Sequence, residues 1–449
     1  MAPDSVVVLS VYEEGLDQNY AASFAELFSR VIISARKDAI QLKIPEGFPT
    51  ECLKKFEFED VDLRNTQGED GLSLKNIFRL FRDNEETIKG VLNISDKLKQ
   101  MMRDMIEYFE NQSDESSWKS ENLFLEVWRA YEQNVSCVYG VFKDKKNKVI
   151  TVTFRGSQFA PCTAVGITRD WRTNLTNWHR ANATPDLARE KLKGQLKNGV
   201  FVHKGFYSYL FDNKFRQNKK QTFFQMKDDV KSLIEDGNPE NYMIYITGHS
   251  LGGALACLSA FNLAGCSEKW IPKPVTCVTL AAPRVGTMGF RKAFQQLEKD
   301  GFLRHLRITY NKDVVPALPS FSFGLLGFSL RFWHMFPKQM KHVGINICAR
   351  NDSIDPPVHP AGLGFWSSVK NAVRNFSLFR PFWAVSRYHD TGGYIKRFRD
   401  NKEALDSLFI DKMYQNPEIV GQDFRTYHYV EEKTNKEANN LDTIEVASA

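Results

Sequence analysis

The chain has no uninterrupted apolar run long enough to span a bilayer, so the sequence predicts no membrane-crossing helix. Its amino terminus, "MAPDSVVVLSVYEEGLDQ", lacks a basic region and carries Asp4, Glu13 and Glu14 around a short apolar stretch, which does not match a secretory signal. We therefore expect a cytoplasmic protein that is at most peripheral to membranes or lipid droplets.

Cysteine is sparse, and the motifs that use it are missing. The 7 cysteines are an odd number without a C-x-x-C pair, which predicts free thiols in a reducing compartment rather than a disulfide framework. Cys257 and Cys277 fall in a predicted helix and a predicted strand and are expected in the core. Because the sequence also lacks H-E-x-x-H, clustered Cys/His spacing and a glycine-rich phosphate loop, it predicts no metal and no cofactor.

The charge of the chain is nearly balanced. The 60 Lys and Arg residues against 54 Asp and Glu give a net charge of +6, which does not favour nucleic acid as a partner. Phenylalanine, in contrast, is abundant: the 34 Phe residues indicate extensive apolar packing or a lipid-facing surface. The sequence predicts no particular oligomeric state.

Three regions follow one another along the chain. We expect a mainly helical N-terminal extension at 1–115, with an amphipathic helix at 85–112, then a main domain at 116–400 and a polar, partly disordered C-terminal tail at 401–449. In the main domain strand patterns alternate with helical ones, which indicates an α/β fold with a mostly parallel, helix-covered sheet. Its expected elements include a helix at 119–133 and strands at 136–143, 148–154, 242–247, 275–281, 304–310 and 341–348.

A serine between glycines marks the strongest candidate for chemistry. In "YMIYITGHSLGGALACLSAFNLAG", Ser250 lies between a predicted strand at 242–247 and a predicted helix at 254–264. A serine at such a strand–turn–helix junction is held in a strained conformation, and Gly248 and Gly252 remove Cβ atoms that would clash there. We predict that Ser250 is a nucleophile; the alternative is a small residue in a tight turn.

A serine hydroxyl needs a histidine base, and that histidine needs a carboxylate to orient it. In sheets of this type the carboxylate and then the histidine follow the serine along the chain. Asp313 stands just after a predicted strand, where functional loops gather, and is favoured over its rivals Asp352 and Asp355 in a polar loop.

Five histidines follow Asp313 in the sequence. They are His334, His342, His359, His389 and His428. His389 precedes a glycine pair and an apparent helix start, in a loop free to lean over the sheet edge. From the residues alone, His389 is only slightly favoured over His359 as the base.

The order of several motifs resembles the class 3 (fungal-type) lipases, a branch of the α/β-hydrolases, over roughly residues 120–400. The motifs are "TVTFRGS", "DWRTNL", "VHKGFYSYL", "GHSLGGALA", "AAPRVGT", "NKDVVPALP", "HVGINI" and "HDTGGYI". The resemblance implies an α/β-hydrolase fold with a mostly parallel central sheet, helices on both faces and here a helical N-terminal extension. It implies His389, followed by Tyr394 and Ile395, as the base and Asp313 as the acid.

The resemblance also implies an oxyanion hole and a lid. The backbone N–H of Leu251 and the backbone and hydroxyl of Ser157 are the expected donors to the oxyanion. A lid follows "FRGS" in the family, but here extra residues, including Pro161 and Gly166, precede the "DWRTNL" motif. Trp171 is the lid candidate; the alternative is a packed core tryptophan.

Two long aromatic segments, 321–336 and 365–385, lie between Asp313 and His389 and contain Arg331, Lys370, Arg374 and Arg380. Such basic, aromatic stretches suit a lipid interface, and we expect them to contact a membrane or droplet or to form an acyl-chain pocket. The alternative is that they fold inward as core.

These observations together predict a serine carboxylic-ester hydrolase that releases fatty acids at a lipid interface. The resemblance to the class 3 lipases favours triacylglycerol and diacylglycerol as substrates. A phospholipase A1 or galactolipid acyl hydrolase is the alternative within the class. A non-lipolytic esterase, or a lipid-binding scaffold with an idle hydrolase site, would be alternatives of other kinds.

Overall fold

The computed structural model describes about half of the chain. The described residues are 10–38, 43, 60–62, 72–87, 100, 103, 107, 123–129, 138–157, 180–182, 185, 199–212, 220–234, 237–313, 315–317, 340–360 and 388–421. Within these ranges no helix is both long enough and apolar enough to cross a membrane.

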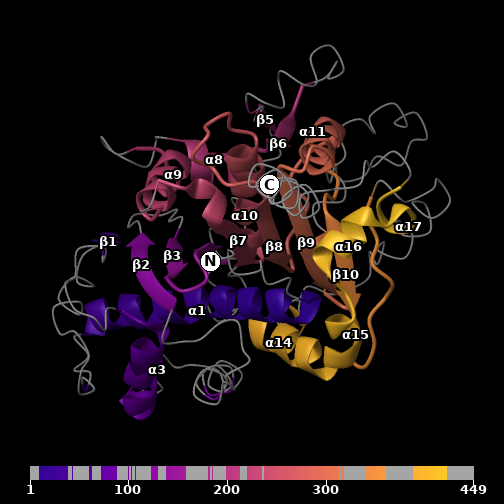
Figure 1. Ribbon diagram of the computed structural model, residues 1–449. Helices are drawn as coiled ribbons and strands as arrows, with labels where there is room; N and C mark the ends of the chain where they lie inside the picture. Colours follow the sequence, from indigo (N-terminus) through magenta and orange to yellow (C-terminus); the bar gives the residue numbers. More distant parts are fainter. Residues whose placement is uncertain are drawn as a thin grey trace, which may run out of the picture.

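An eight-stranded mixed sheet forms the centre of the molecule (Figure 1). Its strands, in spatial order, are β1 (Asp60–Asp62), β2 (Leu123–Arg129), β3 (Tyr139–Asp144), β4 (Val149–Phe154), β7 (Met243–His249), β8 (Val275–Leu280), β9 (Leu303–Tyr310) and β10 (Ile345–Ala349). Pairing is antiparallel from β1 to β4 and parallel from β4 to β10. The predicted α/β fold with a mostly parallel sheet is confirmed. A separate two-stranded ribbon joins β5 (Arg180–Asn182) to β6 (Phe201–His203).

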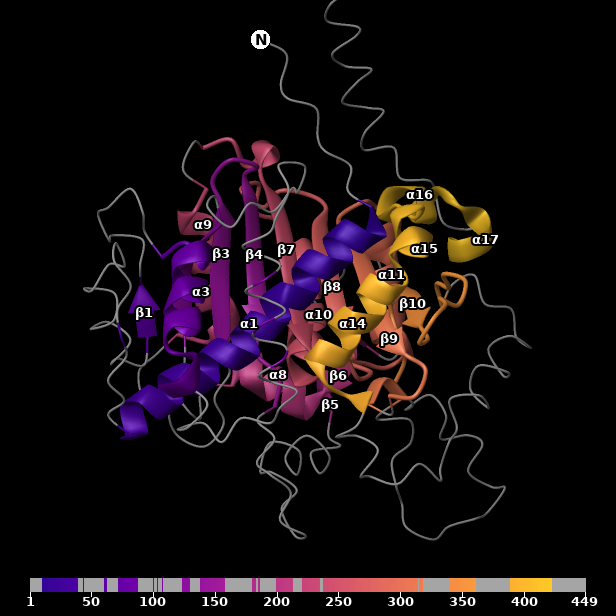
Figure 2. The same ribbon diagram turned by 90° about the horizontal axis from the view of Figure 1, so that it is seen from below.

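Helices cover both faces of the sheet, as Figures 1 and 2 show. One face carries α8 (Lys204–Phe211), α9 (Thr222–Ser232), α10 (Leu251–Ala264) and α11 (Met288–Lys299). The other carries α1 (Val11–Asp38), α3 (Leu74–Asp83), α14 (Thr391–Asp400) and α15 (Lys402–Asp406), with α16 (Ile410–Gln415) and α17 (Pro417–Val420) beside them. Short 3₁₀ turns occur at η1 (Pro239–Asn241) and η2 (Val315–Ala317).

The alternation of side chains along each strand divides the interior into two apolar cores. In β7, Ile244 and Ile246 belong to the core beneath α10, whereas Tyr245 belongs to the core beneath α1. Every residue of β8 and β9 is buried, so both faces of these strands are covered, as expected for a parallel sheet with helices on both sides.

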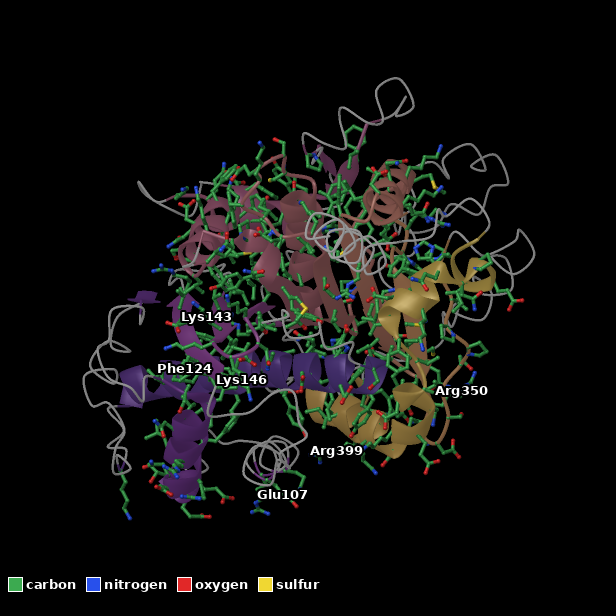
Figure 3. All side chains as sticks on the ribbon, viewed as in Figure 1. Glu107, Phe124, Lys143, Lys146, Arg350 and Arg399 are labelled. Carbon is green, nitrogen blue, oxygen red and sulfur yellow. The ribbon has the colours of Figure 1, made fainter. Side chains whose placement is uncertain are left out.

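The long helix α1 crosses the sheet obliquely and packs on β4, β7 and β8 (Figure 2). It also runs beside α14, where the Arg399 guanidinium, labelled in Figure 3, donates a hydrogen bond to the Tyr20 hydroxyl. The N-terminal region is therefore helical in α1 and α3, and it also adds β1 to the main sheet, which the sequence did not predict. The division into an extension and a main domain stays a prediction.

The helix predicted at 119–133 is wrong, because residues 123–129 form strand β2. From 123 to 126, buried Leu123 and Leu125 alternate with half-buried Phe124 and Glu126, a period of two that fits a strand. Leu, Glu and Arg favour helices in isolation, but β2 hydrogen-bonds to β1 on one side and to β3 on the other. Sheet pairing outweighs that propensity here.

The other predicted strands are confirmed to within a few residues, apart from the start of β10. That strand begins at Ile345 rather than at 341, so His342 precedes it. The first part of the predicted C-terminal tail is helical, because α15, α16 and α17 occupy most of 402–420. Most of the helix predicted at 85–112, and the tail beyond 421, lie outside the described residues.

We expect Glu14→Gln to remove a pH dependence of stability. Glu14 of α1 is buried, and burial, only partly offset by Arg304, raises its pKa from 4.5 to about 7. The folded state then binds more protons than the unfolded state between these values, so the free energy of unfolding falls as pH rises from about 4.5 to 7 and stays low above that. A neutral glutamine avoids this loss, which amounts to at most about 3 kcal/mol.

Urea unfolding at pH 5 and pH 8 measures the effect. The variant should match wild type at pH 5 and be more stable at pH 8, whereas Glu403→Gln, at an exposed site on α15, should behave as wild type at both. Equal pH dependence in wild type and Glu14→Gln would contradict the prediction.

Candidate active site

Ser250 occupies the turn between β7 and α10 in the strained conformation that its sequence context predicts. Its φ of 58° and ψ of −123° are unfavourable for a residue with a side chain. Its N–H donates to the Leu280 carbonyl at 2.9 Å, which ties the turn to β8. A Cβ on Gly252 would lie 2.2 Å from the Phe154 carbonyl oxygen, so only glycine allows α10 to start this close to β4.

His389 bridges Ser250 and Asp313 through its two ring nitrogens. Its Nε2 lies 2.7 Å from Ser250 Oγ, and its Nδ1 lies 2.7 Å from Asp313 Oδ2. Asp313 can only accept, so Nδ1 carries the proton and Nε2 is left to accept from the serine hydroxyl. The three residues come from the ends of β7 and β9 and from the start of α14, and all are buried.

Further hydrogen bonds orient Asp313. Its Oδ1 accepts the Val315 N–H at 2.9 Å, and its Oδ2 accepts the Tyr394 hydroxyl at 2.8 Å in addition to His389. The same Tyr394 oxygen accepts the Tyr310 N–H at 3.1 Å. Burial, and then the Asp313 charge, raise the pKa of Tyr394 well above its usual value, so this hydroxyl remains a donor.

The rival residues have other partners. Asp355 accepts from Arg350, labelled in Figure 3, at 2.8 Å, and Asp352 is exposed. His359 Nε2 lies 3.1 Å from Glu298 Oε2, with both side chains fully buried. Burial, and then Arg307 and Arg284, hold the pKa of His342 well below its usual value. His334 and His428 lie outside the described residues.

The predicted oxyanion donors border Ser250. Leu251 is the first residue of α10, where a backbone N–H has no carbonyl to bond within the helix. Ser157 is buried just beyond β4, and the neighbouring Gly156 is close enough that a Cβ on it would lie 3.6 Å from Ser250 Cβ. Trp171 and the segments 321–336 and 365–385 lie outside the described residues.

Two groups at this site were not assigned a role from the sequence. From the sequence, Tyr394 was noted only because the class 3 lipases have a tyrosine shortly after the histidine. In the structure its hydroxyl donates a hydrogen bond to Asp313. The sequence feature that could have indicated this position is its place one helical turn after Asp390, the N-cap of α14. His249, immediately before Ser250, packs against His389 with ring centroids 4.6 Å apart and a tilt of 35° between the rings. In the part of the chain that the structure describes, no group of three His, Cys, Asp or Glu is arranged to hold a metal ion.

We expect Tyr394→Phe to lower kcat by roughly 3- to 10-fold with little change in KM, and to lower the free energy of unfolding by about 1–3 kcal/mol. The variant leaves the Tyr310 N–H without its acceptor and Asp313 without one donor. Tyr414→Phe is a matched control, because the Tyr414 hydroxyl donates to Glu298 at 2.6 Å and accepts the His305 N–H at 2.8 Å, away from Ser250.

Esterase kinetics and urea unfolding of both variants separate the two effects. Both should lose stability, but only Tyr394→Phe should lose kcat. An equal kcat loss in both variants would mean that Tyr394 acts through stability alone.

Known proteins share sequence with part of this chain. The family model described as "Lipase (class 3)" matches residues 151–323. Phospholipase A1-II 4 of Oryza sativa subsp. japonica is 36% identical over 133 residues, which are 29% of this chain and 33% of that protein. Phospholipase A1-Igamma2, chloroplastic, of Arabidopsis thaliana is 39% identical over 162 residues, 33% of this chain and 30% of that protein. The chain thus matches about a third of the length of these curated relatives.

Solved structures give more distant likenesses. A Rhizomucor miehei lipase propeptide complex has a TM-score of 0.34 and 22% identity, covering 51% of this chain and 58% of its own. A triacylglycerol lipase from Penicillium expansum has a TM-score of 0.34 and 19% identity, covering 51% and 71%. The segment that matches the class 3 lipase model, residues 151–323, includes the strained Ser250 turn and Asp313.

Proposed function

We propose that the protein is a serine carboxylic-ester hydrolase that releases fatty acids from acylglycerols, with triacylglycerol or diacylglycerol as substrate. The observation that carries the proposal is the pair of 2.7 Å contacts that His389 makes with Ser250 and Asp313. A buried serine in a strained turn, a histidine on its hydroxyl and a carboxylate behind the histidine are the parts that acyl transfer requires.

In the proposed reaction, Ser250 Oγ attacks the ester carbonyl while His389 Nε2 takes the hydroxyl proton. Asp313 holds the imidazolium, and the Leu251 N–H and Ser157 donate to the oxyanion of the tetrahedral intermediate. The C–O bond to the alcohol breaks, and the alcohol leaves with the proton from His389. Water then attacks the acyl-serine, His389 passes the water proton to Ser250 Oγ, and the fatty acid departs.

A phospholipase A1 activity is the second candidate for the same site. It is favoured by the sequence relatives, which are named phospholipase A1 and are 36% and 39% identical over the matched segments. A galactolipid acyl hydrolase is a further variant of this candidate. The chemistry at the acyl carbonyl is the same in each case, so the candidates differ only in the headgroup that the enzyme accepts.

We also propose that the enzyme works at a lipid surface and contacts it peripherally. The support is the sequence of 321–336 and 365–385, where rings alternate with Arg331, Lys370, Arg374 and Arg380. Trp171 in the segment after "FRGS" is the proposed apolar contact of the lid. A droplet or membrane of the cytoplasm would be the partner surface.

Initial rates on tributyrin, taken through its solubility limit with Ser250→Ala as the blank, test the proposal. A rise in Ser250-dependent rate when droplets form is the expected result. A panel of dioleoylglycerol, trioleoylglycerol, phosphatidylcholine and monogalactosyldiacylglycerol then ranks the headgroups. Saturation below the solubility limit would support a non-lipolytic esterase, and no hydrolysis of any substrate would support an idle scaffold.

A further inference from the structure

His249 is the aromatic neighbour of the proposed base. Its ring centroid lies 4.6 Å from that of His389 with 35° between the planes, and 6.0 Å from that of Tyr394 in an edge-on arrangement. The backbone of β7 fixes its position, because it is the residue directly before the strained Ser250. His249 therefore presents the face of its ring to His389, while Ser250 and Asp313 engage the edge of the His389 ring.

The His249 ring is neutral in this setting. Burial, and then the neighbouring His389, hold the pKa of His249 well below its usual value. Two further titratable groups contact the pair: Asp313, which accepts from His389, and Tyr394, whose raised pKa keeps its hydroxyl protonated. His249 thus adds no positive charge beside His389 at working pH.

Packing alone does not account for a histidine at this position. The His249 Nε2 atom is buried and has no hydrogen-bond partner within the described ranges. A buried polar atom without a partner is destabilising, and an apolar side chain of similar size would avoid that cost. The residue is therefore better explained by what its ring does for its neighbour.

During acylation and deacylation His389 carries a positive charge. A neutral aromatic face within about 6 Å of a cation attracts it, whereas a charged imidazole would repel it. A ring packed at this distance would also limit rotation of the His389 ring away from the line between Ser250 and Asp313. The contact between His249 and His389 would thus both orient the His389 ring and stabilise its positive charge.

We propose that His249 is a positioning residue, whose neutral ring holds His389 in line with Ser250 and Asp313 and stabilises the imidazolium that forms during the reaction. The inference rests on the proposed triad, and it adds a role for a group that does not touch the substrate.

The test compares His249→Leu with His249→Phe by kcat and by the pH profile of kcat/KM on a soluble ester. Loss of the aromatic face in His249→Leu should lower kcat by roughly 5- to 20-fold at unchanged KM. It should also shift the acid limb of the profile to lower pH by roughly 0.5 to 1 unit, because the charged form of His389 loses stabilisation. His249→Phe, which keeps the face, should recover most of kcat and the wild-type acid limb.

Thr247→Val is the matched control, since Thr247 is buried in the same strand but bonds to α1 through the Gln18 carbonyl at 3.4 Å. It should leave kcat and the acid limb unchanged. If His249→Leu does not fold, as judged by its Tm, His249→Met takes its place with the same expected values.

Two results would overturn the inference: an acid limb that stays at the wild-type pH in the Leu or Met variant, or a Phe variant as impaired as Leu. Either result in an enzyme that still needs Ser250 would reject the role of His249 and leave the triad standing. Full activity in Ser250→Ala would instead reject the triad.

Discussion

Ser250→Ala is expected to lower kcat on a short-chain ester by roughly 10⁵-fold, to the level that an oxyanion hole and substrate binding alone sustain. The variant removes the hydroxyl that His389 Nε2 contacts at 2.7 Å, so no acyl-enzyme forms. Alanine has a Cβ, as serine does, so it adds no backbone strain at the φ of 58°, and the variant should still fold. Burst kinetics with a p-nitrophenyl ester, together with thermal unfolding, measure both effects.

Ser259→Ala is the matched control for this prediction. Ser259 lies in α10, and its hydroxyl is buried without a hydrogen-bond partner in the described part of the chain. Its removal should leave kcat unchanged and stability equal or slightly higher. A Ser250→Ala enzyme with more than about 1% of wild-type activity would be inconsistent with a serine nucleophile at this position.

Asp313→Asn is expected to lower kcat by roughly 10⁴-fold with nearly normal folding, the size of effect seen when a triad carboxylate becomes an amide. The Asp313 oxygens accept from His389, Tyr394 and Val315, and an asparagine has only one oxygen to share among them. Its NH₂ group would face a donor, so His389 would move its proton to Nε2, the nitrogen that must accept from Ser250.

Asp355→Asn provides the comparison, because Asp355 was the sequence rival and pairs with Arg350 at 2.8 Å. That change should alter kcat less than twofold, since exposed or half-exposed ion pairs contribute little. The kcat of both variants on the same soluble ester, with circular dichroism to check the fold, decides the matter. A larger loss in Asp355→Asn than in Asp313→Asn would reverse the assignment.

Ser250 and Asp313 could be predicted as candidate site residues from local signals in the sequence. A buried strand, a glycine-flanked turn and a small-residue helix are contiguous, and an aspartate just after a strand needs only strand order to be placed. The contacts that join them to His389 are long-range, so residue patterns left His389 and His359 nearly equal until the family resemblance was used. In the structure the two histidines differ in their partners: His359 Nε2 lies 3.1 Å from the Glu298 carboxylate on α11, not near Ser250.

The misassigned helix at 119–133 has a related cause. The β2 segment is rich in residues that tolerate helices, and its strand character depends on partners from two other regions, β1 and β3. Neither pairing leaves a local signature. The same holds for α1, whose hydrophobic residues indicate a helix but not the face of the sheet on which it packs.

The path of α1 determines which segments a shorter protein would need in order to fold and to keep the proposed activity. The family-matched segment 151–323 contains Ser250 and Asp313 but stops before His389, and α14, which starts just after His389, packs lengthwise on α1. A protein cut at residues 151 and 323 would lose His389, the proposed proton acceptor, and would expose one side of the sheet to water. We therefore expect residues 11–38 and 388–421 to unfold together with the Ser250 turn, and deletion mapping should find that activity and solubility disappear together at either end.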